Sequence, residues 1–481
     1  MEICFPDIPL YQGWGQPLRV ESTCEGLQLV EGTPPAGLTG DWYRCGPDRQ
    51  YPSLFVDDIF IDGEGMVHQF RFADGQVSYR SRWVRNARFL AQQQAKRALF
   101  GRYRNRYTNA PEAQHVHGGT ANTSLMFHAG KLTVLKEDDL PYEIDPDTLA
   151  TGARTDFGGA VTAVSLSAHP KIDPHRNELI TYSVQARGDG SRDIAVYVFD
   201  AQGHKVHEVW FDAPWSGVVH DFGVTDEHII IPFFPLITDV AALQRGGSFY
   251  EWHDDKAVQV AVLPRRGTAE QVRWFTGPNA SAGHMLNAYS EGSVAHLDVV
   301  LYDGNCFPFF PTPDGRICAS GPPLLTRLSC DLSAGNATYT QRVLCRRPGE
   351  LPRIDDRYMG KPYSQGYLVM GRGADGSGTV GRVDVRTGEV DLWAHGQAIS
   401  VHEPHFLPRH AGAAEGDGWL LVILNRLDRG HSELAVFDAQ AVASGPVARW
   451  HIPVRVRSTF HGCWVSEQLR RDGRYNLGAP T

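Results

Sequence analysis

Residues 193–211, DIAVYVFDAQGHKVHEVWF, are the stretch that best indicates the fold of this chain. Two runs rich in β-branched and aromatic residues flank the polar turn D-A-Q-G-H, which is the pattern of a β-hairpin. Residues 378–395, GTVGRVDVRTGEVDLWAH, repeat the arrangement around R-T-G-E, and strand-like runs such as ELITYSV, EHIIIPFF and GWLLVILNR continue along the chain. The sequence therefore predicts an all-β protein made of antiparallel hairpins. A β-propeller without a regular repeat fits this pattern.

One segment, residues 86–105 (NARFLAQQQAKRALFGRYRN), departs from the strand pattern and predicts a helix. Strand-like runs precede and follow it, so we expect an insertion at approximately 86–120 that caps one face of the β structure. Loops near 233–256 and 304–314 are expected to join this cap. The latter, with Phe307, is too proline-rich for a central strand and reads as an aromatic loop, either packed in the core or lining an apolar passage. We expect residues 1–481 to form a single domain.

Composition limits the classes of function. Of the 481 residues, 42% are hydrophobic, 10% aromatic and 21% charged, which is typical of a soluble globular protein. The formal net charge of −9 argues against a general affinity for nucleic acid. Residues 80–106 depart from this average with nine Lys or Arg and no acid. Such a run is either a solvated face, which we favour, or a region that steers an anionic substrate or contacts anionic lipid.

The cellular location is predicted from the cysteines and the N-terminus. The eight cysteines include no C-x-x-C pair, and MEICFPDIPLYQGWG lacks the basic and apolar regions of a secretory signal. No stretch approaches the roughly 20 apolar residues of a transmembrane helix. We therefore expect a cytoplasmic protein with reduced cysteines. Assembly as a homodimer is left open.

Four of the 20 histidines stand in short segments of distinct character. They are AHPKIDP around His169, VVHDFG around His220, AGHMLNAYSEG around His284 and TFHGCW around His461. Pro, Asp and Gly next to an imidazole favour a strand end or tight turn, where the backbone can direct the side chain inward. Because the segments are far apart in sequence, only a fold that brings distant segments to a common axis would unite them.

Seven motifs in order resemble the carotenoid cleavage oxygenase family, and most closely its bacterial lignostilbene and resveratrol dioxygenases. They are GDWYRCGPD at 40–48, DDIFIDGEGMVHQFRF at 57–72, LKEDDLPYEID at 135–145, the histidine segments, GELPRIDDRYMGKPYSQGY at 349–367, VHEPHFLPR at 401–409 and the terminal HGCW. The resemblance covers most of the chain. It implies a seven-bladed β-propeller with a helical and loop cap over the active-site face.

The resemblance also implies one Fe(II) per chain, bound on the propeller axis. It assigns the four ligands to His169, His220, His284 and His461. Neutral imidazoles suit divalent iron, and four ligands out of six leave positions for dioxygen and substrate. Three carboxylates are placed behind these histidines by the same motifs: Glu137, Glu350 and Glu403. Each would accept the outward N–H of an imidazole and fix its tautomer.

Two further residues bear on the substrate. Stilbene cleavers of the family anchor a 4-hydroxyl group with a Tyr from the cap and a Lys just before the first of these carboxylates, and Tyr103 and Lys136 match both positions. An ammonium group favours the phenolate, whose charge can delocalise onto the central double bond. Adjacent strand residues point to opposite faces, so Lys136 and Glu137 can both reach the centre only at a strand end or bulge.

Ile61 and Phe307 are also assigned to the substrate pocket, and Ile61 stands where the family usually has Phe before Asp-Gly. This departure concerns the identity of the substrate and not the iron. The predicted activity is that of a non-haem Fe(II) dioxygenase that cleaves the central C=C bond of a phenolic 4-hydroxystilbene, of lignin-derived type, with O2 to give two aromatic aldehydes. An apocarotenoid cleavage oxygenase and a non-catalytic propeller that binds ligands are the alternatives.

Overall fold

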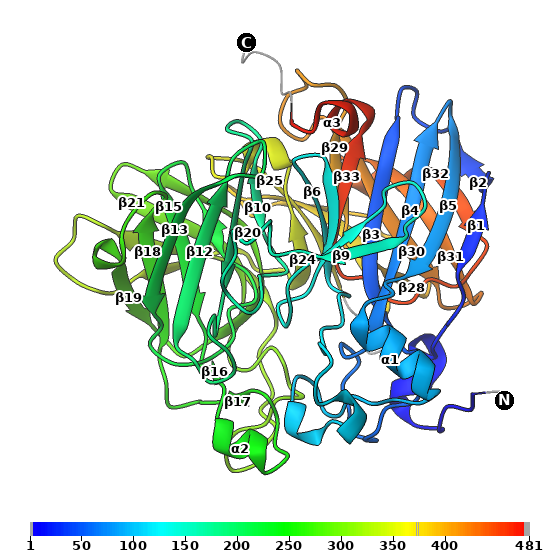
Figure 1. The fold of residues 1–481 in the computed structure, drawn as a ribbon. Helices are drawn as coiled ribbons and strands as arrows, with labels where there is room; N and C mark the ends of the chain where they lie inside the picture. Colours follow the sequence, from blue (N-terminus) through cyan, green and yellow to red (C-terminus); the bar gives the residue numbers. More distant parts are fainter. Residues whose placement is uncertain (1–2, 372, 374, 476–481) are drawn as a thin grey trace.

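The protein is described from a computed structural model that covers residues 3–371, 373 and 375–475. Within these ranges, seven sheets of four or more strands are arranged around a central axis, together with one two-stranded ribbon (Figure 1). This is the seven-bladed β-propeller that the resemblance implied. We number the blades in chain order and give each from its axial strand outwards.

Blade 1 contains β33 (Gly462–Ser466), β3 (Gly40–Asp48), β4 (Glu64–Ala73), β5 (Gln76–Trp83) and β1 (Ser22–Cys24). Blade 2 contains β6 (Ser124–His128), β7 (Lys131–Leu135), β8 (Tyr142–Ile144) and β9 (Thr151–Arg154). Blade 3 contains β10 (Lys171–Asp173), β11 (Glu178–Ser183), β12 (Asp193–Phe199) and β13 (Lys205–Asp212). Blade 4 contains β14 (Gly223–Val224), β15 (His228–Phe233), β18 (Val258–Pro264) and β19 (Arg273–Gly277).

Blade 5 contains β20 (Ser281–Glu291), β21 (Val294–Tyr302), β22 (Leu324–Asp331) and β23 (Thr340–Cys345). Blade 6 contains β24 (Gly349–Arg353), β25 (Gln365–Met370), β26 (Thr379–Asp384) and β27 (Val390–Leu392). Blade 7 contains β28 (Ile399–Val401), β29 (His405–Pro408), β30 (Gly418–Arg426), β31 (His431–Asp438), β32 (Pro446–Ile452) and β2 (Gln28–Gly32). The ribbon pairs β16 (Leu236–Ile237) with β17 (Glu251–Trp252). The hairpins predicted at 193–211 and 378–395 are β12–β13 and β26–β27.

The core is a ring of layers between neighbouring blades. Each of seven apolar clusters in the described chain draws its residues mainly from two adjacent blades. A strand in the middle of a blade is therefore covered on both faces, and residues 194–199 of β12 are all buried. This explains why many strands read as continuous apolar runs and not as alternating patterns.

The two ends of the chain close the ring. The N-terminal strand β2 pairs with β32 of blade 7, and the C-terminal strand β33 pairs with β3 of blade 1. Both junctions join segments that are more than 400 residues apart in sequence, for example Arg44 with Gly462. Closure holds blades 1 and 7 together, so that their facing apolar surfaces are buried against each other.

The helical cap is shorter than the sequence pattern predicts. Helix α1 (Ala87–Ala95) begins after Asn86, whose side chain accepts a hydrogen bond from the Phe89 amide, and it ends where Lys96 adopts a left-handed φ of 54°. A single helix over 86–105 is therefore wrong. The chain turns after Lys96 so that Phe100 and Tyr103 enter two different apolar clusters, which one helix face could not reach.

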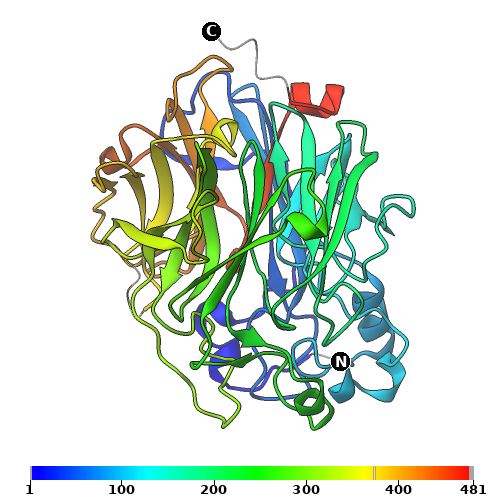
Figure 2. The ribbon, with the colours of Figure 1, turned by 90° about the vertical axis from the view of Figure 1, so that its left-hand side faces the viewer.

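The predicted cap segments lie together at one end of the propeller. Tyr103 shares an apolar cluster with Leu243 of α2 (Val240–Gln244) and with Phe310 of the 304–314 loop. Both views place α1 and α2 at this end and α3 (Glu467–Asp472) at the opposite end (Figures 1 and 2). None of the helices in the described chain is long and apolar enough to cross a bilayer.

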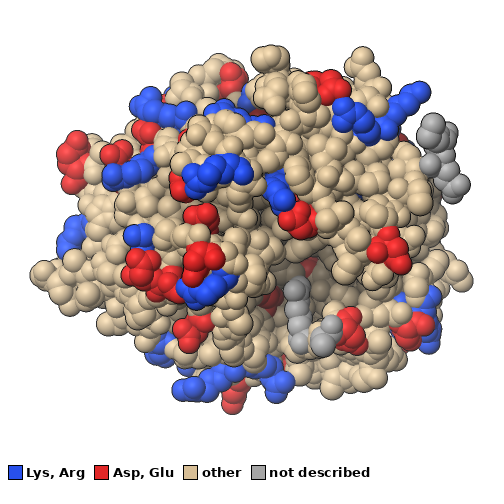
Figure 3. Space-filling model, turned by 90° about the horizontal axis from the view of Figure 1, so that it is seen from below, with Lys and Arg blue, Asp and Glu red and all other residues tan. Residues whose placement is uncertain are grey.

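Within the described chain, five of the nine basic residues at 80–106 are paired with acids. Arg97 lies 2.6 Å from Glu112, and Arg102 lies 2.6 Å from Asp57. Figure 3, which views the molecule from below, shows basic and acidic side chains interspersed over this face. The exposed part of the run therefore contributes to a mixed-charge surface, which agrees with the interpretation of the run as a solvated face.

Candidate metal centre

The four predicted histidines meet on the propeller axis. The Nε2 atoms of His169 and His220 are 3.1 Å apart, and those of His284 and His461 are 3.2 Å apart. One nitrogen from each of the four rings lies within 4.8 Å of every other. Segments that span almost 300 residues of sequence thus present a single cluster of imidazole nitrogens.

The blades supply the cluster in a regular way. Three of the histidines lie one to three residues before an axial strand: His461 before β33, His169 before β10 and His220 before β14. The fourth, His284, lies within the axial strand β20. The three remaining blades supply the predicted carboxylates. Glu350 lies in β24, Glu403 lies between β28 and β29, and Glu137 follows β7. Every blade therefore contributes one residue, because its inner edge ends at the axis.

Two glycines next to the histidines allow this close approach. A Cβ at Gly462 would lie 1.8 Å from the carbonyl oxygen of Tyr43, so the residue after His461 has no room for a side chain. A Cβ at Gly283 would lie 3.0 Å from Oε1 of Glu350, so the residue before His284 is restricted by the carboxylate. The Gly neighbours seen in the sequence are thus required by packing at the axis.

Asp221 ties three of the histidine segments together. Its carboxylate accepts hydrogen bonds from the Met285 amide, next to His284, at 2.8 Å and from Lys171, two residues after His169, at 2.7 Å. Asp221 itself follows His220 and its side chain is only 3% exposed. Asp221 was not among the predicted site residues, although its place directly after His220 in VVHDFG is a signal that could have identified it.

The three carboxylates orient three of the imidazoles. Nδ1 of His284 is 2.7 Å from Glu350, and Nδ1 of His461 is 2.7 Å from Glu403. Nδ1 of His220 is 3.3 Å from Glu137, a longer contact. In each pair the carboxylate accepts the Nδ1 proton, which turns the unprotonated Nε2 towards the axis.

Electrostatics keeps Glu137 and Glu403 ionised and His461 neutral, as metal binding requires. Although burial raises it, Lys136 and His220 bring the pKa of Glu137 well below its ordinary value. Burial likewise raises the pKa of Glu403, but His461 and Arg44 lower it more. Both carboxylates therefore stay ionised. Burial lowers the pKa of His461 to about 4, against the opposing effect of Glu403, so this ring is neutral at pH 7.

The donor set fits a divalent metal ion. Inward-facing nitrogen lone pairs 3.1–3.2 Å apart repel each other unless a cation lies between them. Ligand nitrogens about 2.1 Å from one ion and at right angles to each other are about 3 Å apart, which matches this spacing. Imidazoles held by carboxylates are stronger donors, and an all-nitrogen set suits Fe(II) among other transition ions.

Lys136 and Tyr103 lie next to this centre on the cap side. Strand β7 ends at Leu135, so Lys136 and Glu137 stand in the following turn and both reach inwards. The Lys136 ammonium donates to the Tyr103 hydroxyl at 3.2 Å and lies 3.1 Å from Oε1 of Glu137. That same oxygen contacts His220, so the pair is linked to the histidine cluster.

The pair is buried and its charges are defined. Lys136 is 5% exposed and Tyr103 is 6% exposed. Burial lowers the pKa of Lys136, but Glu137 and Tyr103 raise it more, so the ammonium stays charged. Burial raises the pKa of Tyr103 despite the neighbouring ammonium, so its phenol stays neutral. One fixed cation and one neutral hydroxyl therefore lie side by side beneath the cap.

Apolar side chains surround the pair formed by Lys136 and Tyr103. Ile61 and Phe307 both pack against the cluster that contains Tyr103 and Phe310. The Phe307 ring stands edge-on to His220, with ring centroids 6.2 Å apart. Phe307 thus lies between the cap cluster and His220.

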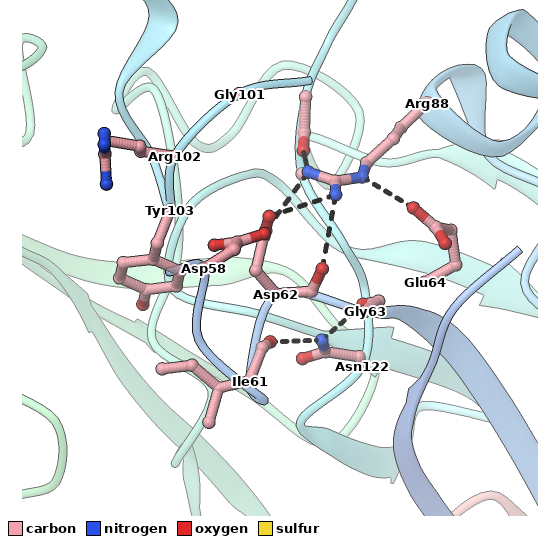
Figure 4. Close-up of polar contacts among 12 residues, drawn as sticks. Asp58, Ile61, Asp62, Gly63, Glu64, Arg88, Gly101, Arg102, Tyr103 and Asn122 are labelled. Carbon is pink, nitrogen blue, oxygen red and sulfur yellow. Dashed lines mark hydrogen bonds and ion pairs between the residues drawn. The ribbon is translucent and has the colours of Figure 1, made fainter. Parts of the chain in front are cut away.

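A buried ionic network holds Ile61 and the cap in place. Arg88 of α1 contacts the carboxylates of Asp62 and Glu64 at distances of 3.0–3.3 Å, and all three side chains are 6% exposed or less. Asn122 donates to the carbonyl oxygens of Ile61 and Gly63 at 2.8 and 2.7 Å. Figure 4 shows the side chains of Ile61 and Tyr103 on the same side of this network.

Comparisons with known proteins agree with this geometry. A family model described as retinal pigment epithelial membrane protein (RPE65) matches residues 15–466. The chain is 36% identical to isoeugenol monooxygenase of Pseudomonas nitroreducens over 469 residues, covering 93% of this chain and 96% of that one. This chain belongs to the carotenoid cleavage oxygenase family.

Two further members of the family are closely similar. Lignostilbene-alpha,beta-dioxygenase isozyme III of Sphingomonas paucimobilis is 36% identical over 479 residues, covering 96% of this chain and 98% of that one. The crystal structure of Pseudomonas brassicacearum lignostilbene dioxygenase superposes with a TM-score of 0.94 at 38% identity, covering 97% of this chain and all of that one.

Some residues at the centre of this family member were missed by reasoning from sequence. Arg44, whose side chain is fully buried, contacts Glu403 at 2.5 Å, and the Tyr302 hydroxyl donates to Glu350 at 3.2 Å. Arg44 is the arginine of GDWYRCGPD, so the motif contained the signal although its role was not assigned. Tyr302 lies at the end of a strand with no motif of its own.

Proposed function

We propose that this member of the carotenoid cleavage oxygenase family is a non-haem Fe(II) dioxygenase that cleaves the central double bond of a 4-hydroxystilbene. The observation that carries the proposal is the Lys136 ammonium, 3.2 Å from the Tyr103 hydroxyl and connected through Glu137 to His220. A phenolic substrate provides the oxygen that such a buried pair would bind.

Iron is the proposed metal, held by His169, His220, His284 and His461. When bound, it supplies the activation of dioxygen, and one oxygen atom is added to each alkene carbon to give two aromatic aldehydes. The carboxylates Glu137, Glu350 and Glu403 keep three of the imidazoles oriented with Nε2 towards the ion. An activity of this kind is supported by the names of the similar lignostilbene and isoeugenol enzymes.

Tyr103 of the cap and Lys136 beneath it would bind and activate the phenol of the substrate. The Tyr103 hydroxyl and the Lys136 ammonium would fix the phenol oxygen, and the ammonium would favour its phenolate form by direct charge attraction. Delocalised phenolate charge makes the double bond electron-rich and thus more reactive towards an electrophilic oxidant. Glu137 keeps Lys136 charged, and the apolar surroundings, including Ile61 and Phe307, exclude water that would weaken this attraction.

Phenol recognition by this pair does not depend on what is attached to the far alkene carbon. A 4-hydroxyphenyl alkene with a short tail is therefore a second candidate substrate, and the isoeugenol monooxygenases favour its inclusion. An apocarotenoid lacks an acidic hydroxyl and would gain nothing from the Lys136 ammonium, whose charge Glu137 already balances at 3.1 Å.

The test is a panel of substrates with anaerobically reconstituted, iron-loaded protein. We expect oxygen uptake and two aldehydes by mass spectrometry from a 4-hydroxystilbene, and much slower turnover of the 4-methoxy analogue. Equal rates on both stilbenes, or faster cleavage of an apocarotenal, would reject phenolate activation. Unchanged metal content in His284→Ala would reject the metal centre itself.

The remaining parts of the proposal concern the whole chain. We propose that residues 1–481 work as one propeller domain whose cap, at 86–120, 233–256 and 304–314, covers the substrate pocket. A cytoplasmic location is supported by the eight cysteines, all of them described and all free. A lignin-derived substrate and assembly as a homodimer stay predictions, the latter tested by light scattering.

A further inference from the structure

A cavity leads to the histidines from the face opposite the cap. It measures about 500 Å³, and its lining includes His169, His284 and His461 at one end and the exposed residues Asp356 and His410 at the other. Residues of α3 also border it, at the end of the propeller opposite α1 and α2 (Figures 1 and 2). We call this cavity the axial channel. Its lining does not include Tyr103, Lys136, Ile61 or Phe307.

The cap side is unsuited to the passage of a hydrated ion. Around Tyr103, the cap cluster consists of buried apolar and aromatic side chains, among them Trp252 and Phe310, which are 1% and 5% exposed. A divalent ion that crossed such a layer would lose its water and gain few ligands, which is very unfavourable. The organic substrate and a metal ion therefore require different surroundings on their way to the same histidines.

The charges along the axial channel are balanced in pairs. Four carboxylates and three basic side chains line it. Each basic group is paired with a carboxylate of the same wall: Lys171 with Asp221 at 2.7 Å, Arg357 with Asp355 at 2.5 Å, and Arg353 with Asp356 at 3.3 Å. Glu403, beside His461, is the fourth acid, and it is paired with Arg44 behind the wall at 2.5 Å. The basic side chains therefore do not form a barrier of unpaired positive charge.

His405 stands in the wall of the axial channel, two residues after Glu403. It is 3% exposed, and its Nδ1 atom has no hydrogen-bond partner among the described residues. Burial, together with the nearby Arg353, keeps the pKa of His405 well below its ordinary value, so the ring is neutral. Nδ1 itself is shielded from the channel, but His405 lines the cavity, and the neutral ring can turn to bring its unsatisfied nitrogen to a passing ion.

We propose that the axial channel is the route by which the divalent metal ion reaches the four histidines, with Asp356 at its mouth and His405 as a transient ligand within it. This inference rests on the metal-binding role proposed above for the histidines. The organic substrate would then enter at the cap end of the propeller, and the metal ion would enter at the opposite end.

The experiment measures the rate of metal uptake by apoprotein prepared with a chelator, using Co(II) alone as the probe and its absorption in the histidine site as the signal. We expect Asp356→Arg to slow uptake by about ten-fold at low ionic strength, with a smaller effect at high salt. We expect His405→Leu to slow uptake several-fold at any salt concentration. Neither should change the final stoichiometry of one Co(II) per chain.

Matched control variants distinguish an effect on the axial channel from a general effect of changing surface charge or removing a histidine. Glu291→Arg makes the same charge change at an exposed site outside the channel, and His204→Leu removes an exposed histidine; both should load like the wild type. Ile61→Trp, which fills the cap side, should also leave uptake unchanged. Because Asp356 is exposed, its variant stays informative if His405→Leu fails to fold.

Two outcomes would overturn different claims. Uptake that is unaffected by Asp356→Arg, or that is slowed by Ile61→Trp instead, would overturn the proposed route. Failure of the wild-type protein to bind one Co(II) per chain at equilibrium would overturn the metal centre, and with it the proposed function. Rates and stoichiometry are read from the same titration, so the two failures are distinguishable.

Discussion

Replacing Arg88 with methionine tests whether the buried network of Figure 4 holds the substrate pocket. The Arg88 side chain is 6% exposed and contacts Asp62 and Glu64, which are 3% and 5% exposed. Arg88→Met keeps the helix and the aliphatic volume but leaves two buried carboxylates without their cation. Breaking a buried ion pair in this way costs about 3–5 kcal/mol.

The expected shift in melting temperature follows from the size of the chain. At about 2.1 cal/mol/K per residue, the entropy of unfolding of 481 residues is roughly 1 kcal/mol/K, so Tm should fall by about 3–5 °C. Because Asp62 directly follows Ile61, and α1 precedes the turn that holds Tyr103, we also expect KM for a 4-hydroxystilbene to rise. Scanning calorimetry and steady-state kinetics measure the two effects.

Arg102→Met is the matched control for this prediction. Arg102 pairs with Asp57, whose side chain is 61% exposed, and such surface pairs contribute less than about 1 kcal/mol. Its Tm should stay within about 1 °C of the wild type. If Arg88→Met melts no lower than Arg102→Met, or if its KM is unchanged, the network does not support the pocket and the reasoning is refuted.

Three further predictions concern the centre itself. Lys136→Met should lower kcat/KM for a 4-hydroxystilbene by about 10- to 100-fold, because a hydrogen bond to a charged group contributes about that much. The kcat/KM for the 4-methoxy analogue should be unchanged. Equal losses on the two substrates would contradict phenolate binding. Glu403→Gln should weaken metal affinity by about 10- to 100-fold in a chelator competition, and more than Glu137→Gln does, because the contact of Glu403 with its histidine is 2.7 Å and that of Glu137 is 3.3 Å. Removal of metal by a chelator should lower Tm, and Fe(II) at 1,000 times its Kd should restore about 4 kcal/mol of stability; an unchanged Tm would mean that no tight site exists.

Much of the fold could be predicted because strands carry local signals. The hairpins at 193–211 and 378–395 were recognisable from composition and turn residues alone. The helix after Asn86 was predicted too long, because helix propensity over 86–105 does not contain the tertiary contacts that pull Phe100 and Tyr103 in different directions. Those contacts, and not local preference, end the helix at Lys96.

The candidate site, too, could be predicted only in part from the sequence. The histidines and carboxylates stood in motifs that resemble a family, so their identity could be inferred before their positions were known. Lys136 and Glu137 presented a conflict for a regular strand, and the end of β7 at Leu135 resolves it. Asp221 and Tyr302 could not be assigned beforehand, since their roles depend on partners about 50 or more residues away.

By itself, the sequence indicated the class of fold, because turn residues and strand-forming runs are local signals. Its resemblance to a family then pointed to the groups able to bind a metal and to the pair proposed to bind a phenol. Only the tertiary structure decided which groups meet. Closure of the ring brings one residue from each blade to a common axis, and the burial that results sets the charge of Lys136 and Glu137. Convergence and desolvation are properties of the packed chain, and no local segment contains them.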